Sequence, residues 1–520
     1  MKYSYQVVSC PVPEKLKPYF LVINSLYKDA LKNNYEEEFI ENFKIILQKL
    51  NESIKLGETP SPTNIYQSSE HPVKLGETIP KIAINKNTVN KNNLSHLTPG
   101  QQEAFTSLIR FIRNSKAKYF RLSGYAGTGK SFLMVELMRW LMSGKLRFVG
   151  AAPTNKAAKN LQNLANKVGL DIECTTIAKL LGQQPELNKE TGKEEFLSAE
   201  DVDLGIYQVI ILDEFSMISR ANFEEIVKAI AKEKTKVIFV GDAAQLPPVG
   251  EEQPIVATSN LITEFATLTE VVRFDGKIGQ VAEDIRSNNT YTQRCYPYKT
   301  TEDQSIICLK RQEWLTTASH FFKSEQYQTN SDFCRILVWR NKTADSLNNW
   351  IRGQLWGKDA SSYVKGDRLI ARKPVFRSSS NYAGKSKYQW TILMNNSEEC
   401  TIVEEPKLLS ESKLPYWSIP VITDDETEIT IRILTPKAEQ ERQKLLQEYS
   451  TAKKWDKYQD LDKKFDYCSF AYCITTHKAQ GSTIEHIFID PTDMILSDDR
   501  QKLQYTALTR AKIRAYIPLG

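Results

Sequence analysis

One glycine-rich segment carries the clearest chemical signal in this sequence. It reads Gly124-Tyr-Ala-Gly-Thr-Gly-Lys-Ser131 and fits the pattern G-x-x-x-x-G-K-[ST] in full. Its glycines let backbone N–H groups converge on phosphate oxygens, Lys130 adds a positive charge near the terminal phosphates, and the hydroxyl of Ser131 can bind Mg²⁺. An apolar strand is expected over 119–122 and an apolar helix over 132–142, whose N-terminus favours anions. The segment therefore predicts a nucleotide-phosphate site.

Two carboxylates follow a second apolar run, residues 209–212. A strand beside the phosphate loop would bring Asp213 into the Mg²⁺ shell and would let Glu214 orient and deprotonate an attacking water. An Asp-Glu pair after a strand is common, but downstream of a phosphate loop it indicates a hydrolytic site. We therefore expect ATP and Mg²⁺ as the cofactors.

A third apolar run, residues 237–240, precedes the segment Gly241-Asp-Ala-Ala-Gln-Leu-Pro-Pro-Val-Gly250. Gln245 in this segment is a neutral side chain that could hydrogen-bond a γ-phosphate and report its presence. By itself it could equally be a polar residue of a turn. Both interpretations stay open at this point.

Strands that alternate with helical patterns would position these residues. Further apolar runs occur at 147–151, 335–339 and 487–489. The alternation predicts βαβ units and parallel sheets, in which buried strands read as near-continuous apolar runs. Because the pattern returns after residue 335, we predict an α/β protein with two such domains in series.

Three regions depart from this pattern. Residues 361–435 contain short strand-like runs separated by Pro, Gly, Ser and Asn, which predicts a small β-barrel inserted into the second α/β domain. The charged stretch 437–464 is expected to be a solvated helix. Residues 1–95 are expected to form a mainly helical extension, with an amphipathic pattern over 39–54, and a linker.

The composition is that of an ordinary globular protein. The chain has 520 residues, of which 41% are hydrophobic and 25% charged, and is too long for a single core. Its net charge of +6 fits a polyanionic partner but does not require one. The eight cysteines show no C-x-x-C spacing, so we expect reduced thiols and no zinc site. No signal peptide or membrane-spanning apolar run is visible, so we expect a cytoplasmic protein without a membrane partner. We also expect it to be a monomer.

Longer motifs give a specific family resemblance. The run Asp213-Glu-Phe-Ser-Met-Ile218, with Gly-Asp-Ala-Ala-Gln-Leu-Pro-Pro-Val after it, resembles motifs II and III of superfamily 1 helicases, above all the 5′→3′ group of RecD-like and Dda-type enzymes. Five other stretches are similar to the Q motif and to motifs Ia, IV, V and VI, in the family's order: Leu97–Ala104, Ala152–Ala158, Leu268–Phe274, Thr475–Thr483 and Tyr505–Ala511. The resemblance covers about 97–518 and implies two RecA-like P-loop NTPase domains in tandem.

The resemblance also implies domain boundaries. The first RecA-like domain would span 96–275, with a β-hairpin insertion at about 182–197. The second would comprise 276–360 and 465–520. An SH3-like β-barrel and the charged helical stretch, at 361–464, would interrupt it.

The same resemblance implies roles for individual residues. Catalysis would depend on six side chains, with one arginine acting as a finger from the second domain: Lys130, Asp213, Glu214, Gln245, Arg273 and Arg510. ATP would contact the phosphate loop and its surroundings: Gln101, Gly124, Ala126, Gly127, Thr128, Gly129, Lys130, Ser131, Phe132 and Gly481. Mg²⁺ would be held by Ser131 and Asp213. DNA would contact motif Ia, motif V and the hairpin: Thr154, Asn155, Lys156, Thr476, His477 and Phe196.

Three of these assignments have an alternative. Arg273 could form a surface ion pair, His477 could orient its loop, and Phe196 could anchor the hairpin instead of wedging the duplex open.

The resulting hypothesis is an ATP-dependent DNA helicase that moves 5′→3′ on single-stranded DNA and acts at junctions with duplex, in replication, repair or recombination. An RNA-directed motor of the same superfamily is a second hypothesis, because backbone contacts alone do not read the 2′-hydroxyl. A third is an ATP-switched loading or remodelling protein that binds single strands without processive unwinding. Residues 1–95 match no helicase motif, and a protein partner could bind there.

Overall fold

The computed structural model describes residues 96–170, 172–187, 194–197, 202–270, 277–287, 299–379, 389–411 and 413–519. The N-terminal extension and linker expected over 1–95 lie outside these residues, and so does Arg273. None of the described helices combines the length and apolar character needed to cross a membrane.

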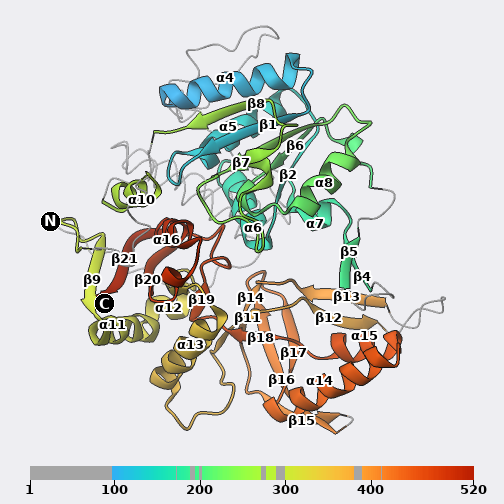
Figure 1. Cartoon of the computed structure of the whole chain (residues 1–520), viewed down its shortest axis with the longest axis vertical. Helices are drawn as coiled ribbons and strands as arrows, with labels where there is room; N and C mark the ends of the chain where they lie inside the picture. Colours follow the sequence, from blue (N-terminus) through green and yellow to red (C-terminus); the bar gives the residue numbers. More distant parts are fainter. Residues whose placement is uncertain are drawn as a thin grey trace, which may run out of the picture. The chain divides into compact units, whose positions relative to one another are not determined.

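The first sheet has six parallel strands in the order β3-β2-β6-β7-β1-β8 (Figure 1). Their bounds are Tyr119–Gly124 for β1, Phe148–Ala152 for β2, Cys174–Thr176 for β3, Val209–Leu212 for β6, Lys236–Gly241 for β7 and Glu264–Leu268 for β8. β1 lies between β7 and β8, and β6 is the next neighbour of β7. The carboxyl ends of parallel strands meet at one edge, so the segments that follow β1, β6 and β7 emerge side by side.

Helices cover both faces of this sheet. One face carries α4 (Pro99–Asn114), α5 (Lys130–Ser143) and α6 (Asn155–Lys167), and the other carries α7 (Ile177–Leu180), α8 (Arg220–Ala229) and α9 (Ile255–Thr258). α4 begins with a complete capping box, in which the side chains of Thr98 and Gln101 each accept from the other's backbone. α6 begins at the side chain of Thr154, which accepts from Ala157 N.

The second sheet has five parallel strands in the order β19-β10-β20-β21-β9. These are Ile306–Lys310 (β9), Cys334–Val338 (β10), Cys473–Thr475 (β19), Ile484–Ile489 (β20) and Ala511–Leu519 (β21). α10 (Lys277–Ser287) and α16 (Arg500–Leu508) pack on one face. α11 (Arg311–Lys323) and α13 (Asn341–Trp356) pack on the other, and α12 (Glu325–Thr329) follows α11. The predicted α/β fold, with two parallel sheets, is confirmed.

An antiparallel sheet interrupts the second α/β domain. Its path is β15-β16-β14-β11-β18, and β17 pairs with β16. The bounds are Arg368–Ala371 (β11), Glu399–Ile402 (β14), Lys407–Glu411 (β15), Leu414–Thr423 (β16), Glu428–Leu434 (β17) and Cys468–Phe470 (β18). A hairpin of β12 (Val375–Ser379) and β13 (Gln389–Met394) contributes Val375 and Met394 to the apolar core of this unit.

Two details of this insertion differ from the sequence expectation. The inserted sheet includes β18, so it continues past the expected boundary at residue 464, because Cys468–Phe470 pairs with β11. The charged stretch forms two helices, α14 (Pro436–Thr451) and α15 (Trp455–Lys464). Most residues of the two helices are exposed or half-buried, as expected for a solvated helical stretch, but Arg442 of α14 is fully buried, with its guanidinium carbon 4.5 Å from the ring centre of Tyr467. Its long side chain packs through its stem and ring face as well as through its charge.

The expected hairpin in the first domain occurs as two short paired strands. β4 (Gln184–Leu187) and β5 (Glu194–Leu197) are antiparallel, and Phe196 pairs with Pro185. The turn at 188–193 and the side chain of Phe196 lie outside what the structure describes.

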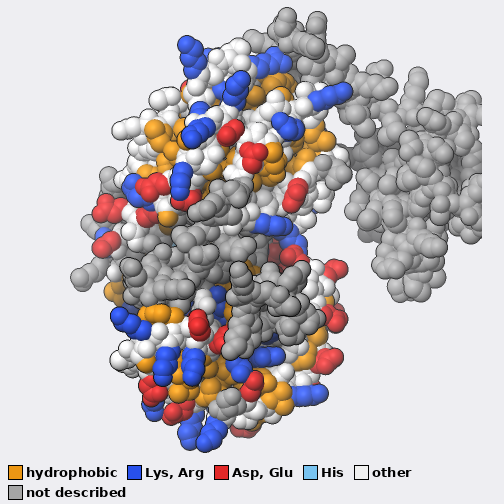
Figure 2. Space-filling model, turned by 90° about the vertical axis from the view of Figure 1, so that its right-hand side faces the viewer, with side chains coloured by type: hydrophobic (Ala, Val, Ile, Leu, Met, Phe, Trp, Pro, Cys, Tyr) orange, Lys and Arg blue, Asp and Glu red, His pale blue; other side chains and the backbone are white. Residues whose placement is uncertain are grey.

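The surface carries both signs of charge. On the face shown in Figure 2, Lys and Arg side chains are interspersed with Asp and Glu side chains. This agrees with the small net charge of +6.

Candidate active site and nucleic-acid interface

The phosphate loop joins β1 to α5 and depends on a left-handed glycine. Gly129 has a φ of 80° and caps α5. A Cβ at this position would lie 2.3 Å from the side-chain nitrogen of Gln101, so only glycine fits. The ammonium of Lys130 donates to the carbonyl oxygens of Gly124 and Tyr125, at 2.7 and 3.0 Å. The loop thus holds its lysine at the start of α5, where anions are favoured.

Gln101 lies directly against this loop. Its side-chain nitrogen donates to Thr128 O at 3.1 Å, and its side-chain oxygen accepts from Thr98 N. Only 3% of the residue is exposed. Gln101 therefore links the capping box of α4 to the phosphate loop, and the adenine contact implied by the resemblance stays a prediction. Phe132 remains 44% exposed near the same loop.

The two carboxylates follow β6. Asp213 accepts from Glu214 N at 2.9 Å. Burial and the neighbouring Glu214 carboxylate raise the pKa of Asp213 to about 7, although that hydrogen bond and Lys130 act in the opposite direction. Glu214 has φ 52° and ψ 49°, a left-handed conformation that costs energy for a residue other than glycine. Such strain is a feature of functional sites.

The donor set at this position fits Mg²⁺. Ser131, Asp213 and Glu214 line the same cavity, and hard oxygen ligands with room for water are what Mg²⁺ prefers. A carboxyl group whose ionisation is opposed by burial also gains from a nearby cation. Within the described residues, no group of three or more His, Cys, Asp or Glu side chains forms a closed metal site.

The end of β7 packs against the segment that follows these carboxylates. A Cβ on Gly241 would lie 2.7 Å from Phe215 N, so the close approach requires glycine. Gln245 is 3% exposed, and its side-chain oxygen is buried without a hydrogen-bond partner. A buried acceptor without a partner is rare, and one that lines a cavity indicates a binding role.

Arg510 joins these residues from the second domain. It is 6% exposed, and its guanidinium donates to Thr506 O, Ser482 O and the hydroxyl of Thr509. A cavity of about 510 Å³ is lined by residues from both α/β domains, including Lys130, Ser131, Phe132, Asp213, Glu214, Gln245, Gly481 and Arg510. Residues almost four hundred positions apart therefore share one cavity. Gly481, with a φ of 74°, accepts from the Asn160 side chain through its carbonyl oxygen.

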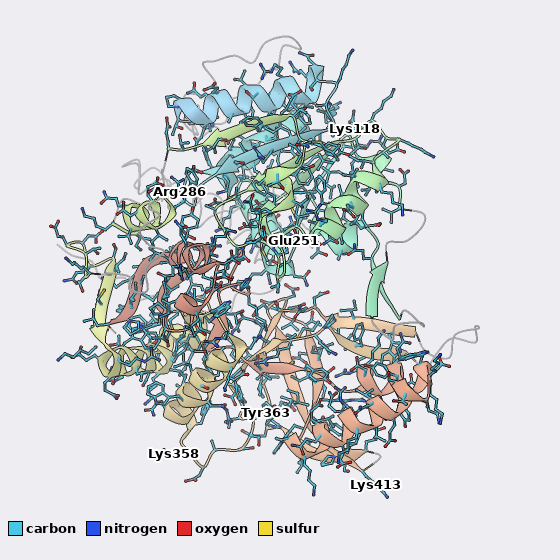
Figure 3. All side chains as sticks on the ribbon, in the orientation of Figure 1. Lys118, Glu251, Arg286, Lys358, Tyr363 and Lys413 are labelled. Atoms are coloured by element: carbon cyan, nitrogen blue, oxygen red, sulfur yellow. The ribbon has the colours of Figure 1, made fainter. Side chains whose placement is uncertain are left out.

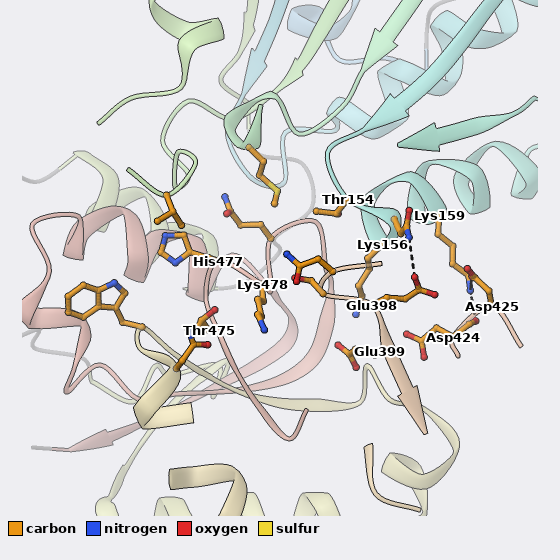
Figure 4. Close-up of a pocket in the computed structure, with 18 of the residues that line it drawn as sticks. Thr154, Lys156, Lys159, Glu398, Glu399, Asp424, Asp425, Thr475, His477 and Lys478 are labelled. Carbon is orange, nitrogen blue, oxygen red and sulfur yellow. Dashed lines mark hydrogen bonds and ion pairs between the residues drawn. The ribbon is translucent and has the colours of Figure 1, made fainter. Parts of the chain in front are cut away.

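A second cavity, of about 530 Å³, lies beside motifs Ia and V (Figure 4). Thr154, Asn155, Lys156 and His477 line it, and so do Met217, Val249 and Trp339. Val249 is 87% exposed. The lining combines cationic, acidic, polar and apolar side chains, and its cationic and aromatic members are of the kinds that contact phosphates and bases of a single strand.

Acidic residues already pair with the polar side chains of α6 that line this cavity. The Asn155 amide donates to Glu398 at 3.2 Å, and the ammonium of Lys156 lies 2.8 Å from Asp332. Lys159 pairs with Asp425 at 2.6 Å (Figure 4). The positive charges of α6 are therefore partly neutralised from within the chain.

Two of the expected DNA contacts, Thr154 and Thr476, already use their hydroxyls within the chain. Thr154 uses its hydroxyl to cap α6. Thr476 is fully buried and donates its hydroxyl to Val338 O, and the neighbouring Thr475 lines the cavity in its place. Burial lowers the pKa of His477, although Asp499 opposes the shift, and this favours the neutral form of its ring.

Comparisons with known proteins extend these observations. Residues 96–305 match the model of an AAA domain, and residues 470–517 match that of a UvrD-like helicase C-terminal domain. The ATP-dependent DNA helicase Dda of Enterobacteria phage T4 is 27% identical over 448 residues, which cover 80% of this chain and 98% of Dda. The chain is a superfamily 1 helicase of the Pif1, Dda and RecD-like group. The resemblance found in the motifs is thereby confirmed.

Other relatives of this helicase span similar lengths. An uncharacterized protein of Acanthamoeba polyphaga mimivirus is 25% identical over 499 residues, covering 80% of the helicase and 98% of that protein. The ATP-dependent DNA helicase Pif1 of Campylobacter jejuni is 23% identical over 420 residues, with 75% and 86% covered. A crystal structure of Bacteroides Pif1 with ADP-AlF3 and single-stranded DNA matches with a TM-score of 0.43 and 17% identity, covering 81% of the helicase and 92% of Pif1.

The structure also brings to the site residues that the motifs did not single out. The hydroxyl of Tyr505 donates to the carboxylate of Asp242 and accepts from the backbone N–H of Ala126 in the phosphate loop. Arg286 of α10, labelled in Figure 3, places its guanidinium carbon 3.6 Å from the ring centre of Tyr125. Tyr505 stands inside a motif, but its spacing in the sequence does not show which segment it contacts.

Proposed function

We propose that this helicase hydrolyses ATP at the cavity between its two α/β domains and thereby moves 5′→3′ along single-stranded DNA and unwinds duplex DNA. The observation that carries the proposal is the convergence of Lys130, Asp213 and Glu214 with Arg510 around one cavity. In this proposal the two α/β units are tandem RecA-like P-loop NTPase domains, and the inserted antiparallel sheet is an SH3-like barrel.

Each residue at the cavity has a distinct role in the proposed reaction. Glu214 takes a proton from the attacking water, whose oxygen bonds to the γ-phosphorus as the bond to the β–γ bridging oxygen breaks, and ADP and phosphate leave. Lys130 and Arg510 offset the negative charge on the transferred group. Gln245 supplies an acceptor that orients the water. Ser131 and Asp213 would hold Mg²⁺, which when bound would offset negative charge on the phosphate groups of ATP.

Movement along DNA follows from the position of Arg510. Because the arginine comes from the second domain, the complete site forms only when the two domains are close together, and this makes closure depend on ATP. The second cavity is the proposed path of the strand, with Asn155, Lys156 and His477 as contacts. Such contacts to phosphates and base faces tolerate any sequence.

A tailed-duplex assay tests the function directly. We expect ATPase activity that single-stranded DNA stimulates, and unwinding of a 5′-tailed duplex. Unwinding of 3′-tailed duplexes alone would overturn the polarity. Lys130→Ala is expected to abolish hydrolysis, and a hydrolysing Lys130→Ala protein would overturn the site.

The same preparation separates the alternative functions. Stronger ATPase stimulation by poly-U than by poly-dT would favour an RNA-directed motor. Stimulated ATPase without strand separation would favour a loading or remodelling protein. The proposed working form is a cytoplasmic monomer that acts on single strands and junctions in replication, repair or recombination, with residues 1–95 as a candidate binding region for a protein partner.

A further inference from the structure

One tyrosine hydroxyl of the second domain contacts two segments of the first. Tyr505, on α16, is 2% exposed. Its hydroxyl donates to a carboxylate oxygen of Asp242 at 2.6 Å and accepts from Ala126 N at 3.2 Å. Ala126 belongs to the phosphate loop, and Asp242 follows β7. A single side chain therefore links the phosphate loop and the end of β7 to the other domain.

The hydroxyl is chemically suited to this link. Burial and Asp242 raise the pKa of Tyr505 above its ordinary value, so the phenol keeps its proton at neutral pH and can donate it to the carboxylate. Asp242 is itself only 1% exposed. If the two domains separated, the carboxylate of Asp242 and the amide of Ala126 would lose this shared partner and would bind water instead, so both segments would be released from α16.

The second domain also holds the segment that carries Gln245. The other carboxylate oxygen of Asp242 accepts from Ala244 N at 2.9 Å, and Gln245 N donates to Asp242 O. One residue later, Leu246 N donates to the hydroxyl of Thr506, and Leu246 O accepts from the side chain of Gln480. Gln245 thus stands between two points at which the second domain holds its backbone.

We propose that Tyr505 is a positioning residue of the ATPase reaction, which sets the phosphate loop and Gln245 according to the placement of the second domain. This inference rests on the proposed function. Tyr505 acts through Ala126 and Asp242, and Gln245 is the group that faces the cavity of Lys130 and Arg510. Small displacements at such a site are expensive, because catalysis depends on the geometry of the reacting groups.

The chain offers a matched control for the loss of a tyrosine hydroxyl. Tyr472 is 1% exposed, and its hydroxyl donates to the buried carboxylate of Asp367 at 2.9 Å. Neither residue lines either of the two cavities described above. Tyr472→Phe therefore removes the same kind of hydrogen bond at a distance from the ATPase cavity.

The test compares Tyr505→Phe with Tyr472→Phe in the full chain. With saturating single-stranded DNA, we expect Tyr505→Phe to lower kcat for ATP about tenfold or more, while KM for ATP changes by less than about threefold, because the lost contact positions catalytic groups. Tyr472→Phe should lower the melting temperature but keep kcat within about twofold of wild type. Equal kcat losses in both variants would show a general stability effect and would overturn the inference.

A double variant tests whether Tyr505 acts through Gln245. If part of its effect passes through Gln245, the loss of kcat in Tyr505→Phe combined with Gln245→Ala should be smaller than the product of the two single losses. If the two substitutions lower kcat independently, so that their losses multiply, Tyr505 does not act through Gln245.

Thr506→Val serves as a second variant if Tyr505→Phe is poorly folded. It removes the hydroxyl that accepts from Leu246 N, and it should reproduce the loss of kcat at nearly unchanged KM. Wild-type protein without DNA-stimulated ATPase would overturn the proposed function itself, whereas normal stimulation of Tyr505→Phe would overturn this inference alone.

Discussion

The ammonium of Lys159 lies 2.6 Å from the carboxylate of Asp425. This ion pair and the hydrogen bond from Asn155 to Glu398 join α6 of the first domain to turns of the inserted sheet. Both contacts lie at the cavity proposed to hold the DNA strand (Figure 4). In the proposed DNA complex these carboxylates would compete with DNA phosphates for the same polar side chains.

Removal of these carboxylates should strengthen DNA binding. We expect the double variant Glu398→Gln, Asp425→Asn to bind labelled single-stranded DNA about threefold more tightly at low salt, because two negative charges leave a site that faces phosphates. The difference should shrink as salt screens the charges. Fluorescence anisotropy at two salt concentrations measures both effects.

Glu441→Gln is the control for this prediction. Glu441 is an exposed carboxylate on α14, paired with Lys444, and does not line the cavity. Its substitution should leave DNA affinity unchanged. Weaker binding by the double variant would contradict a competition between these carboxylates and DNA.

Loss of Arg510 should affect hydrolysis far more than nucleotide binding. An arginine finger contributes about 10³–10⁵ in rate, so Arg510→Ala is expected to lose at least about 10³ in kcat. Arg510→Lys should not restore it, because a lysine cannot reproduce the planar guanidinium. Steady-state ATPase assays with single-stranded DNA measure the loss. Lys512→Ala is the control and should behave as wild type. Lys512 lies in β21, two residues after Arg510, and forms an exposed ion pair with Glu485.

The sequence predicted most of the ATPase cavity because its residues stand at strand ends. In a parallel sheet these ends share one edge, so the positions of Lys130, Asp213 and Gln245 follow from the strand order. The cross-domain contacts could not be predicted in the same way. The partner of Tyr505 depends on how two domains pack, and no local pattern encodes it.

The inserted sheet shows a second limit of sequence reasoning. β16, Leu414–Thr423, contains two prolines, which disfavour a strand inside a sheet, yet it pairs with three neighbours. β18 joins the sheet from a distant part of the chain. Strand pairing between remote segments stabilises both elements, and tertiary packing of this kind overrides local propensity.

Gly241→Ala should disturb the catalytic carboxylates and lower stability. The new methyl group would lie 2.7 Å from Phe215 N, directly after Glu214, so the backbone must shift. We expect a loss of about 1–3 kcal/mol in the free energy of unfolding and a fall in kcat.

Gly353→Ala is the control, because a Cβ at that position in α13 meets nothing within 4 Å. It should be neutral or stabilising by about 0.5–1 kcal/mol in the same denaturation experiment. A stable, fully active Gly241→Ala protein would show that the β7 end does not constrain Glu214.

The Mg²⁺ requirement of the ATPase should depend on pH through Asp213. Burial and Glu214 raise the pKa of this carboxyl to about 7, so it is largely protonated at pH 6 and ionised at pH 8. Protons and Mg²⁺ therefore compete for it, and the Mg²⁺ concentration for half-maximal activity should be about tenfold higher at pH 6 than at pH 8. Asp213 also affects the pH dependence of the free energy of unfolding, in the opposite direction to a salt-bridged carboxylate, because its pKa is raised and not lowered by folding. The protonated form stabilises the fold most below the unfolded pKa of about 4, and that contribution is lost as pH rises through 7. Assays at fixed MgATP, with free Mg²⁺ varied, separate the site from the nucleotide's own Mg²⁺ binding. A half-maximal concentration that does not change between pH 6 and 8 would exclude Asp213 as the titrating Mg²⁺ ligand.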